Sequence, residues 1–133
     1  MITREAFIQD REKVFDKVYG ALSGLAIGDS FGDASRKAEN RAAYQVTTDF
    51  NKGASWSTDD TEFALLTAKT LIRCRGKLTT EECVKSWMED VCVQDEYKRG
   101  GASEIEAANN LRKGLLPPLT GKFNVFHMSD GSS

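Results

Sequence analysis

Two adjacent carboxylates flanked by hydroxyls form the stretch of the sequence best suited to chemistry. Ser57-Thr58-Asp59-Asp60-Thr61 stands where an apolar run of helical period begins. Ser, Thr and Asp satisfy the unbonded amides at a helix start, so the simplest interpretation is an N-terminal cap. One acceptor suffices for a cap, however, and neighbouring carboxylates repel each other unless a cation or several donors compensate them. Carboxylate and hydroxyl oxygens suit Mg²⁺ and Mn²⁺ and suit zinc poorly, so the stretch predicts either a cap or part of a hard-cation site.

Helices must position this stretch, because apolar residues recur with helical period in four segments while strand-like alternation is weak. The fold class predicted is therefore all-α. The first helix is expected from about Thr3 to Ile27, either continuous or broken once, and the second from about Asp59 to Arg73, with Gly76 as its stop.

Two spacings typical of a capping box predict the starts of the third and fourth helices. Thr79 precedes Glu82 by three residues, and Ser103 stands in the same relation to Glu106. Gly114, before Pro117-Pro118, is expected to end the fourth helix. The residues expected to face the core are Phe7, Ile8, Val14, Phe15, Val18, Leu22 and Leu25 in the first helix, Phe63, Leu66, Thr67, Thr70 and Leu71 in the second, Val84, Trp87, Met88 and Val91 in the third, and Ile105, Ala108 and Leu111 in the fourth.

Residues 28–57 are expected to form a connection of about thirty residues, far longer than the ~2–8 residues usual between bundle helices. It opens with Gly28-Asp29-Ser30-Phe31-Gly32-Asp33 and is rich in small residues that let a backbone approach a ligand. The simpler alternative is a helix C-cap at Gly28 followed by a turn.

Composition limits the class of protein. The 133 residues suit one domain, 1–133, and 40% hydrophobic with 29% charged residues is ordinary for a globular chain. A net charge of −2 argues against a nucleic-acid partner held by bulk electrostatics. The apolar runs are shorter than the ~18 residues of a membrane span, and the polar start lacks a signal-peptide core, so no membrane association and a cytoplasmic location are expected.

The three cysteines, Cys74, Cys83 and Cys92, are spaced nine residues apart, and the chain has one histidine, His127. No zinc-ligand spacing is present. Reduced, partly buried thiols are the favoured interpretation over a catalytic Cys–His pair, because nothing beside the cysteines marks an activated thiolate.

Two motifs in tandem resemble the ADP-ribosylglycohydrolase family. The family's Gly-Ala-Leu-x-Gly-Leu-Ala-x-Gly-Asp-x-x-Gly is matched by residues 20–32, and its Trp-x-Thr-Asp-Asp-Thr is matched by residues 56–61. Ser129-Asp130-Gly131-Ser132-Ser133 is similar to the family's loop of Asn or Asp, Gly and Ser. The resemblance covers nearly the whole chain in order.

The resemblance implies an all-α fold with two Mg²⁺ ions, Mn²⁺ in some members, that hydrolyses the bond from ADP-ribose to a protein side chain or a related group. The implied metal ligands are Thr58, Asp59 and Asp60, and the two aspartates also carry the implied catalytic role. The implied partner is an ADP-ribosylated protein or an ADP-ribose-containing small molecule. The residues implied to line the ribose and phosphates are Asp29, Gly32, Gly100, Gly101, Ser129, Asp130 and Gly131.

Two departures from the family pattern matter. Arg36 stands where the family has an acidic residue, with Asp33 and Glu39 as open substitutes. The family's C-terminal Asp-x-Asp-Thr motif, which supplies further metal ligands, is not in the sequence. We therefore expect a truncated fold whose activity depends on complementary ligands from a partner chain or from a missing C-terminal portion, with self-association through exposed apolar faces. The alternative is a non-catalytic ADP-ribose-binding or protein-binding module.

Overall fold

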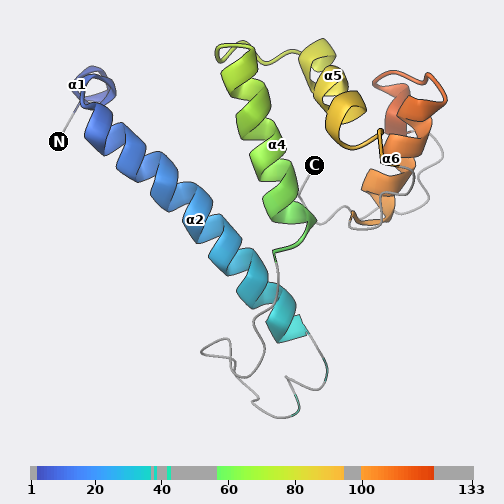
Figure 1. Ribbon diagram of the computed structural model, residues 1–133, viewed down its shortest axis with the longest axis horizontal. Helices are drawn as coiled ribbons and strands as arrows, with labels where there is room; N and C mark the ends of the chain where they lie inside the picture. Colours follow the sequence, from blue (N-terminus) through green and yellow to red (C-terminus); the bar gives the residue numbers. More distant parts are fainter. Residues whose placement is uncertain (1–2, 37, 39–41, 43–56, 95–99, 122–133) are drawn as a thin grey trace. The chain divides into compact units, whose positions relative to one another are not determined.

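The computed structural model describes residues 3–36, 38, 42, 57–94 and 100–121, and every regular element in these ranges is a helix (Figure 1). The predicted all-α class is confirmed. The chain groups into two compact units, residues 1–57 and 58–133. The elements are α1 (Arg4–Gln9), α2 (Arg11–Arg36), α4 (Asp59–Arg73), α5 (Thr80–Asp90), α6 (Ala102–Arg112) and a short 3₁₀ helix η1 (Leu119–Gly121).

The first unit contains α1 and α2, separated by the break that the sequence predicted. Asp10 lies at the break, and its Oδ1 accepts the backbone N–H of Lys13 at 3.1 Å. Contrary to expectation, α2 continues through Gly28 and Gly32 to Arg36. A glycine inside a helix lowers the stability of the helix by only roughly 1 kcal/mol. No proline follows Gly28 before Arg36, so the backbone hydrogen bonds of the helix continue. The prediction of a connection beginning at Gly28 is therefore wrong for residues 28–36.

The apolar stripe of α2 does not face a core. The side chain of Phe15 is 70% exposed and stacks on Tyr19, with ring centroids 6.0 Å apart. The other described helix of this unit, α1, has six residues and is too short to cover the 26 residues of α2. The prediction of burial is therefore wrong for four residues of the stripe, namely Ile8, Phe15, Val18 and Leu25.

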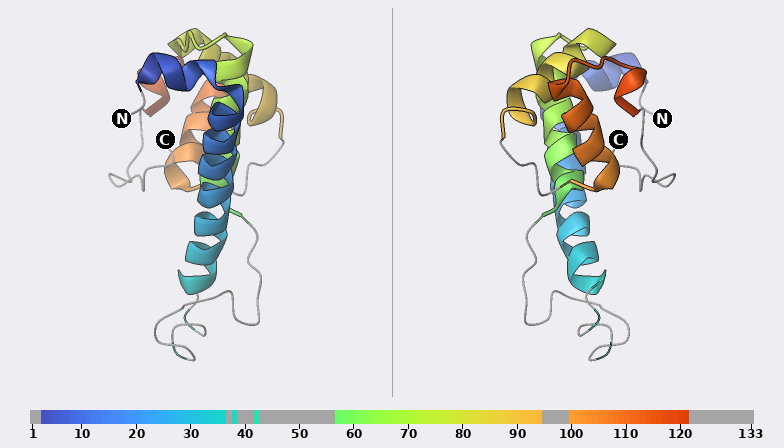
Figure 2. Two further views of the ribbon diagram at one scale, coloured as in Figure 1. Left: turned by 90° about the vertical axis from the view of Figure 1, so that its left-hand side faces the viewer. Right: turned by 90° about the vertical axis from the view of Figure 1, so that its right-hand side faces the viewer.

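The second unit is built by α4, α5 and α6, with α4 packed on α5, α5 on α6, and α6 on η1 (Figures 1 and 2). Phe63, Val91 and Ala108 form its buried centre, one residue from α4, one from the end of α5 and one from α6. The ring of Phe63 stacks on that of Trp87 at 5.0 Å. This core fixes the direction of α4 and hence the position of its first turn.

Most residues expected to face this core do so. Phe63, Thr70, Val91, Ala108 and Leu111 are buried, and Leu66, Val84, Trp87 and Ile105 are half-buried. The expectation is wrong for Thr67, Leu71 and Met88, which are exposed. The buried face of α4 is narrower than the apolar stripe predicted from the sequence, because α5 is the helix that packs on α4.

Polar side chains of α4 and α5 bond to one another across the two helices. The Thr70 hydroxyl lies 2.7 Å from the Leu66 carbonyl and 2.5 Å from the Ser86 hydroxyl. Arg73 joins α4 to α5 through ion pairs with Glu82 at 2.9 Å and Glu89 at 2.8 Å. These bonds hold the two helices in register, since an arginine guanidinium presents its donors in a fixed plane.

The helix ends confirm three of the four predicted signals. Thr79 caps α5 by accepting the Glu82 N–H at 3.3 Å, and Gly76 and Gly114 take positive φ angles of 79° and 83° after α4 and α6. The capping box predicted at Ser103 is wrong. The N-cap of α6 is Gly101, so Ser103 lies inside the first turn.

In the parts of the chain that the structure describes, no helix combines the length and apolarity needed to cross a bilayer.

Candidate functional site

The first turn of α4 differs from the starts of α1, α2 and α5 in that its N-cap side chain makes no capping hydrogen bond. Thr3 caps α1 by accepting the Ala6 N–H at 3.2 Å, and Asp10 and Thr79 cap α2 and α5 in the same way. Thr58 is the N-cap of α4 with extended backbone, yet its side chain makes no capping hydrogen bond. The cap interpretation of the polar stretch therefore does not describe the Thr58 hydroxyl.

Asp59, the first residue of α4, is bonded to a distant part of the chain. Its Oδ2 accepts the backbone N–H of Gly101 at 3.3 Å, across 42 positions of sequence. Gly101 is the N-cap of α6, so the starts of two helices meet at this carboxylate. The acidic motif and the Gly100-Gly101 pair, which the resemblance implied to share a site, are thus brought together.

The neighbours of Asp59 differ in their access to solvent. Thr58, Asp59, Gly100 and Gly101 are half-buried, and Asp60 is exposed. Asp60 and Glu62 add negative charge to the first turn of α4, where the positive end of the helix dipole favours it. The site therefore offers one oriented carboxylate and one solvent-accessible carboxylate on consecutive residues.

The chemistry of this donor set fits a hard divalent cation in type. It supplies two carboxylates and a hydroxyl, and Mg²⁺ prefers such oxygen ligands in near-octahedral geometry with several waters retained. Within the described ranges, no three His, Cys, Asp or Glu side chains gather as a group that would hold a metal. Thr58, Asp59 and Asp60 thus provide part of a coordination shell, which water or further ligands must complete.

The other residues expected at the site fall in different places. Asp29 and Gly32 lie in the last third of α2, inside the helix and not in a loop as expected. Asp33 also lies in α2, and Arg36 is the last residue of that helix. Ser129, Asp130 and Gly131, together with Glu39 and His127, lie outside the described residues.

The cysteines behave as reduced, structural thiols. Cys74, Cys83 and Cys92 are free and half-buried. Burial raises the pKa of the Cys92 thiol, although the nearby Arg112 guanidinium opposes the shift. Because the thiolate is the nucleophilic form, the raised pKa of this thiol argues against a catalytic role for it.

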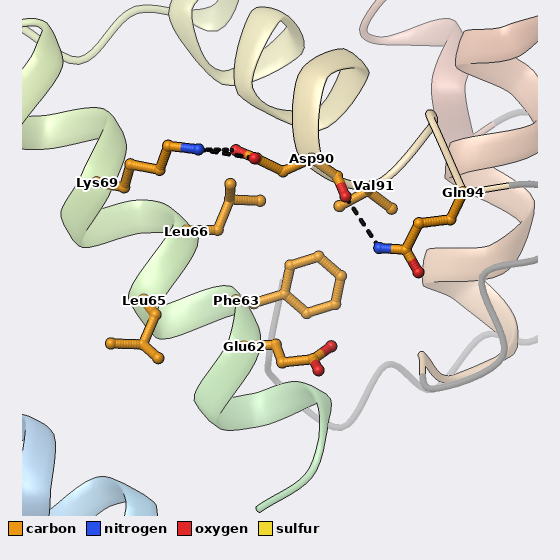
Figure 3. A pocket seen from close by; sticks show the side chains of 8 residues that line it. All are labelled: Glu62, Phe63, Leu65, Leu66, Lys69, Asp90, Val91 and Gln94. Atoms are coloured by element: carbon orange, nitrogen blue, oxygen red, sulfur yellow. Dashed lines mark hydrogen bonds and ion pairs between the residues drawn. The ribbon is translucent and has the colours of Figure 1, made fainter.

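A cavity of about 310 Å³ begins one turn along α4 from Asp59 and was not expected from the sequence (Figure 3). Phe63, Leu66 and Val91 contribute apolar lining, and Glu62 lies at one end. Both carboxylate oxygens of Asp90 bind the Lys69 ammonium group at 2.7 Å. Lys69 and Asp90 are 21 positions apart, so sequence spacing carried no signal of their pairing.

A comparison with protein families gave a match that is consistent with the all-helical fold. The model of the ADP-ribosylglycohydrolase family matches residues 10–132, nearly the whole chain. The chain belongs to the ADP-ribosylglycohydrolase family. Comparison with curated proteins and with solved structures gave no match.

Proposed function

We propose that the chain is a metal-dependent hydrolase that removes ADP-ribose from a protein side chain or a related acceptor, using Mg²⁺ held by Thr58, Asp59 and Asp60. The observation that carries the proposal is the use of the first turn of α4. The Thr58 side chain makes no capping hydrogen bond, and Asp59 accepts an amide from the start of α6. A turn that served only to begin a helix would direct these groups at its own amides, as Asp10 and Thr79 do.

The residues have separable roles in this proposal. The Gly101 amide fixes the orientation of Asp59, and the exposed Asp60 carboxylate is accessible to water and can accept a proton. Bound Mg²⁺ would supply a polarised water and a fixed position for the ribose hydroxyls. The donors on α4 alone leave the shell incomplete, which supports the prediction that a complementing chain contributes ligands.

The test is release of ADP-ribose from a modified protein in the presence of Mg²⁺, with and without a chelator. We expect Asp59→Ala and Asp60→Ala each to lower release by roughly 100-fold or more, because each removes a charged ligand or proton acceptor. Asp10→Ala is the matched control, since this aspartate also begins a helix but caps it, and release should stay within about twofold of wild type. Release that survives both α4 substitutions, or that persists without a divalent cation, contradicts the proposal.

The second candidate, a binding module without hydrolysis, is favoured by Arg36, which ends α2 where the family has an acidic residue. The same assay separates the two candidates when thermal unfolding is added. A binder shows a higher melting temperature with ADP-ribose and no release. A hydrolase releases ADP-ribose, and the release depends on Asp59.

A further inference from the structure

We propose that Gly101 is a positioning residue for Asp59, so that the start of α6 determines how well the candidate site holds a divalent cation. This inference rests on the proposed function and adds a role for a backbone amide. The hydrogen bond from the Gly101 N–H to Oδ2 of Asp59, at 3.3 Å, is the contact that carries it.

This hydrogen bond occupies one of the two carboxylate oxygens of Asp59. Within the described residues, Oδ2 accepts the Gly101 amide while Oδ1 accepts no hydrogen bond. A carboxylate offers about four lone-pair sites on its two oxygens, so one bond limits its rotation and leaves acceptor capacity for a cation. Partners that orient a ligating side chain commonly change metal affinity about 10-fold to 100-fold when they are removed.

The position of Gly101 explains why its amide is available to Asp59. The first N–H groups of a helix and its N-cap have no acceptor within the helix. Gly101 is the N-cap of α6, with φ −63° and ψ 172°, so its N–H points away from the helical ladder. The bond to Asp59 therefore satisfies a donor that α6 cannot satisfy, and it links α6 to the first residue of α4.

The φ angle of Gly101 suits a substitution that removes the amide donor. Proline has a fixed φ near −65° and no N–H, which matches the observed φ of −63°. Gly101→Pro therefore deletes the hydrogen bond while keeping φ close to its present value. Gly101→Ala is the matched control, because it adds a Cβ as proline does but keeps the N–H.

The first measurement is amide hydrogen exchange of Gly101 in the metal-free chain. We expect the Gly101 amide to be protected in wild type and to exchange at least about 10-fold faster in Asp59→Ala, since the described structure gives it no other acceptor. Equal protection in the two proteins overturns the proposal.

The second measurement is the affinity for Mg²⁺ by calorimetric titration. We expect Gly101→Pro to weaken binding by roughly 10-fold and Gly101→Ala to change it by less than about twofold. Wild-type affinity in Gly101→Pro, with binding lost in Asp59→Ala, overturns the positioning role while leaving the proposed function intact. No Mg²⁺ binding in the wild-type chain overturns the proposed function, and the positioning role with it, whatever the exchange experiment shows.

A further variant serves if Gly101→Pro fails to fold, as shown by loss of its helical circular dichroism signal. Asp59→Glu keeps the charge and moves the carboxylate one methylene away from the Gly101 amide. We expect it to weaken Mg²⁺ binding by roughly 10-fold and to release the Gly101 amide to exchange. Unchanged affinity in Asp59→Glu, with the Gly101 amide deprotected, overturns the positioning role.

Discussion

Thr58 and Thr79 both stand immediately before a helix, and their hydroxyls are used differently. Thr79 accepts the Glu82 N–H at 3.3 Å, whereas the Thr58 side chain makes no capping bond to α4. The two residues have the same side chain and a similar extended backbone, with a ψ of −163° at Thr58 and 164° at Thr79. The two threonines therefore form an internal comparison between a capping side chain and a candidate ligand.

This comparison gives a prediction at the scale of single residues. Thr79→Ala should lower the free energy of unfolding by about 1 kcal/mol, the usual cost of a lost cap, and leave Mg²⁺ binding unchanged. Thr58→Ala should cost less than about 0.5 kcal/mol but weaken Mg²⁺ binding. Urea unfolding and calorimetric titration measure the two quantities. Thr58→Ser, which keeps the hydroxyl, is the control, and a loss of stability in Thr58→Ala as large as that in Thr79→Ala would contradict the assignment.

The candidate ligands were predictable from sequence, but their partner was not. Adjacent carboxylates at a helix start are visible in the order of residues, so Thr58, Asp59 and Asp60 could be singled out. The bond between Asp59 and the Gly101 amide spans 42 positions and exists only because α5 folds back between α4 and α6. The resemblance implied that Gly101 lines the substrate, which stays a prediction, and the structure adds a bond from its amide to Asp59.

At the scale of elements, the end of α4 is formed by a tight hydrogen-bonded turn with one unfavourable residue. The Gly76 N–H bonds the Leu71 carbonyl at 2.8 Å and the Arg75 N–H bonds the Ile72 carbonyl at 3.2 Å, the pattern of a Schellman motif. Arg75 takes a φ of 52° at the position where glycine is usual. After α6, the corresponding left-handed position is occupied by Gly114, with a φ of 83°.

This difference predicts opposite effects of two neighbouring substitutions. Arg75→Gly should raise the free energy of unfolding by about 0.5–1 kcal/mol, because relief of the left-handed strain exceeds the entropy cost of a new glycine. Gly76→Ala should lower it by about 1 kcal/mol, since a Cβ there finds open space but the φ of 79° is strained. Thermal unfolding of the two variants measures both effects, and destabilisation by Arg75→Gly would show that the Arg75 side chain contributes contacts that outweigh the strain.

The bounds of a helix were predictable where a capping or stop residue coincides with the start or end of the apolar residues that recur with helical period. The bounds expected for α4, Asp59 to Arg73, are those observed, and the stops at Gly76 and Gly114 are confirmed. The end of α2 was missed because a glycine stops a helix only where the following residues favour a turn. Ser103 was assigned wrongly because Gly101, which has no side chain to signal a cap, precedes it.

At the scale of the whole molecule, much apolar surface is exposed in the described residues. Ile72 on α4 is 80% exposed, while the core cluster of the second unit has three buried members. Exposed apolar faces of this kind are typical of surfaces that pack against another chain or segment. They support the prediction of self-association or a complementing chain.

Composition and motif order predicted the class of the whole molecule, but not its core. The all-α class and the family are confirmed, the latter over residues 10–132. The stripe of α2 has the right period for burial, yet Phe15 remains exposed because periodicity says which residues share a face and not what covers it. Single-domain organisation over 1–133 stays a prediction, as do the cytoplasmic location and the absence of a nucleic-acid partner.

The central claim, that the first turn of α4 holds a divalent cation, is tested most directly by titrating the ¹⁵N-labelled chain with Mn²⁺. This paramagnetic ion broadens the amide signals nearest to it, and even weak binding is enough to reveal its position. We predict that broadening centres on residues 58–61 and on Gly100 and Gly101, is reversed by excess Mg²⁺, and disappears in Asp59→Ala with Asp60→Ala. Broadening that centres on other acidic residues, such as Glu81 and Glu82 at the start of α5, and spares residues 58–61 would contradict the account.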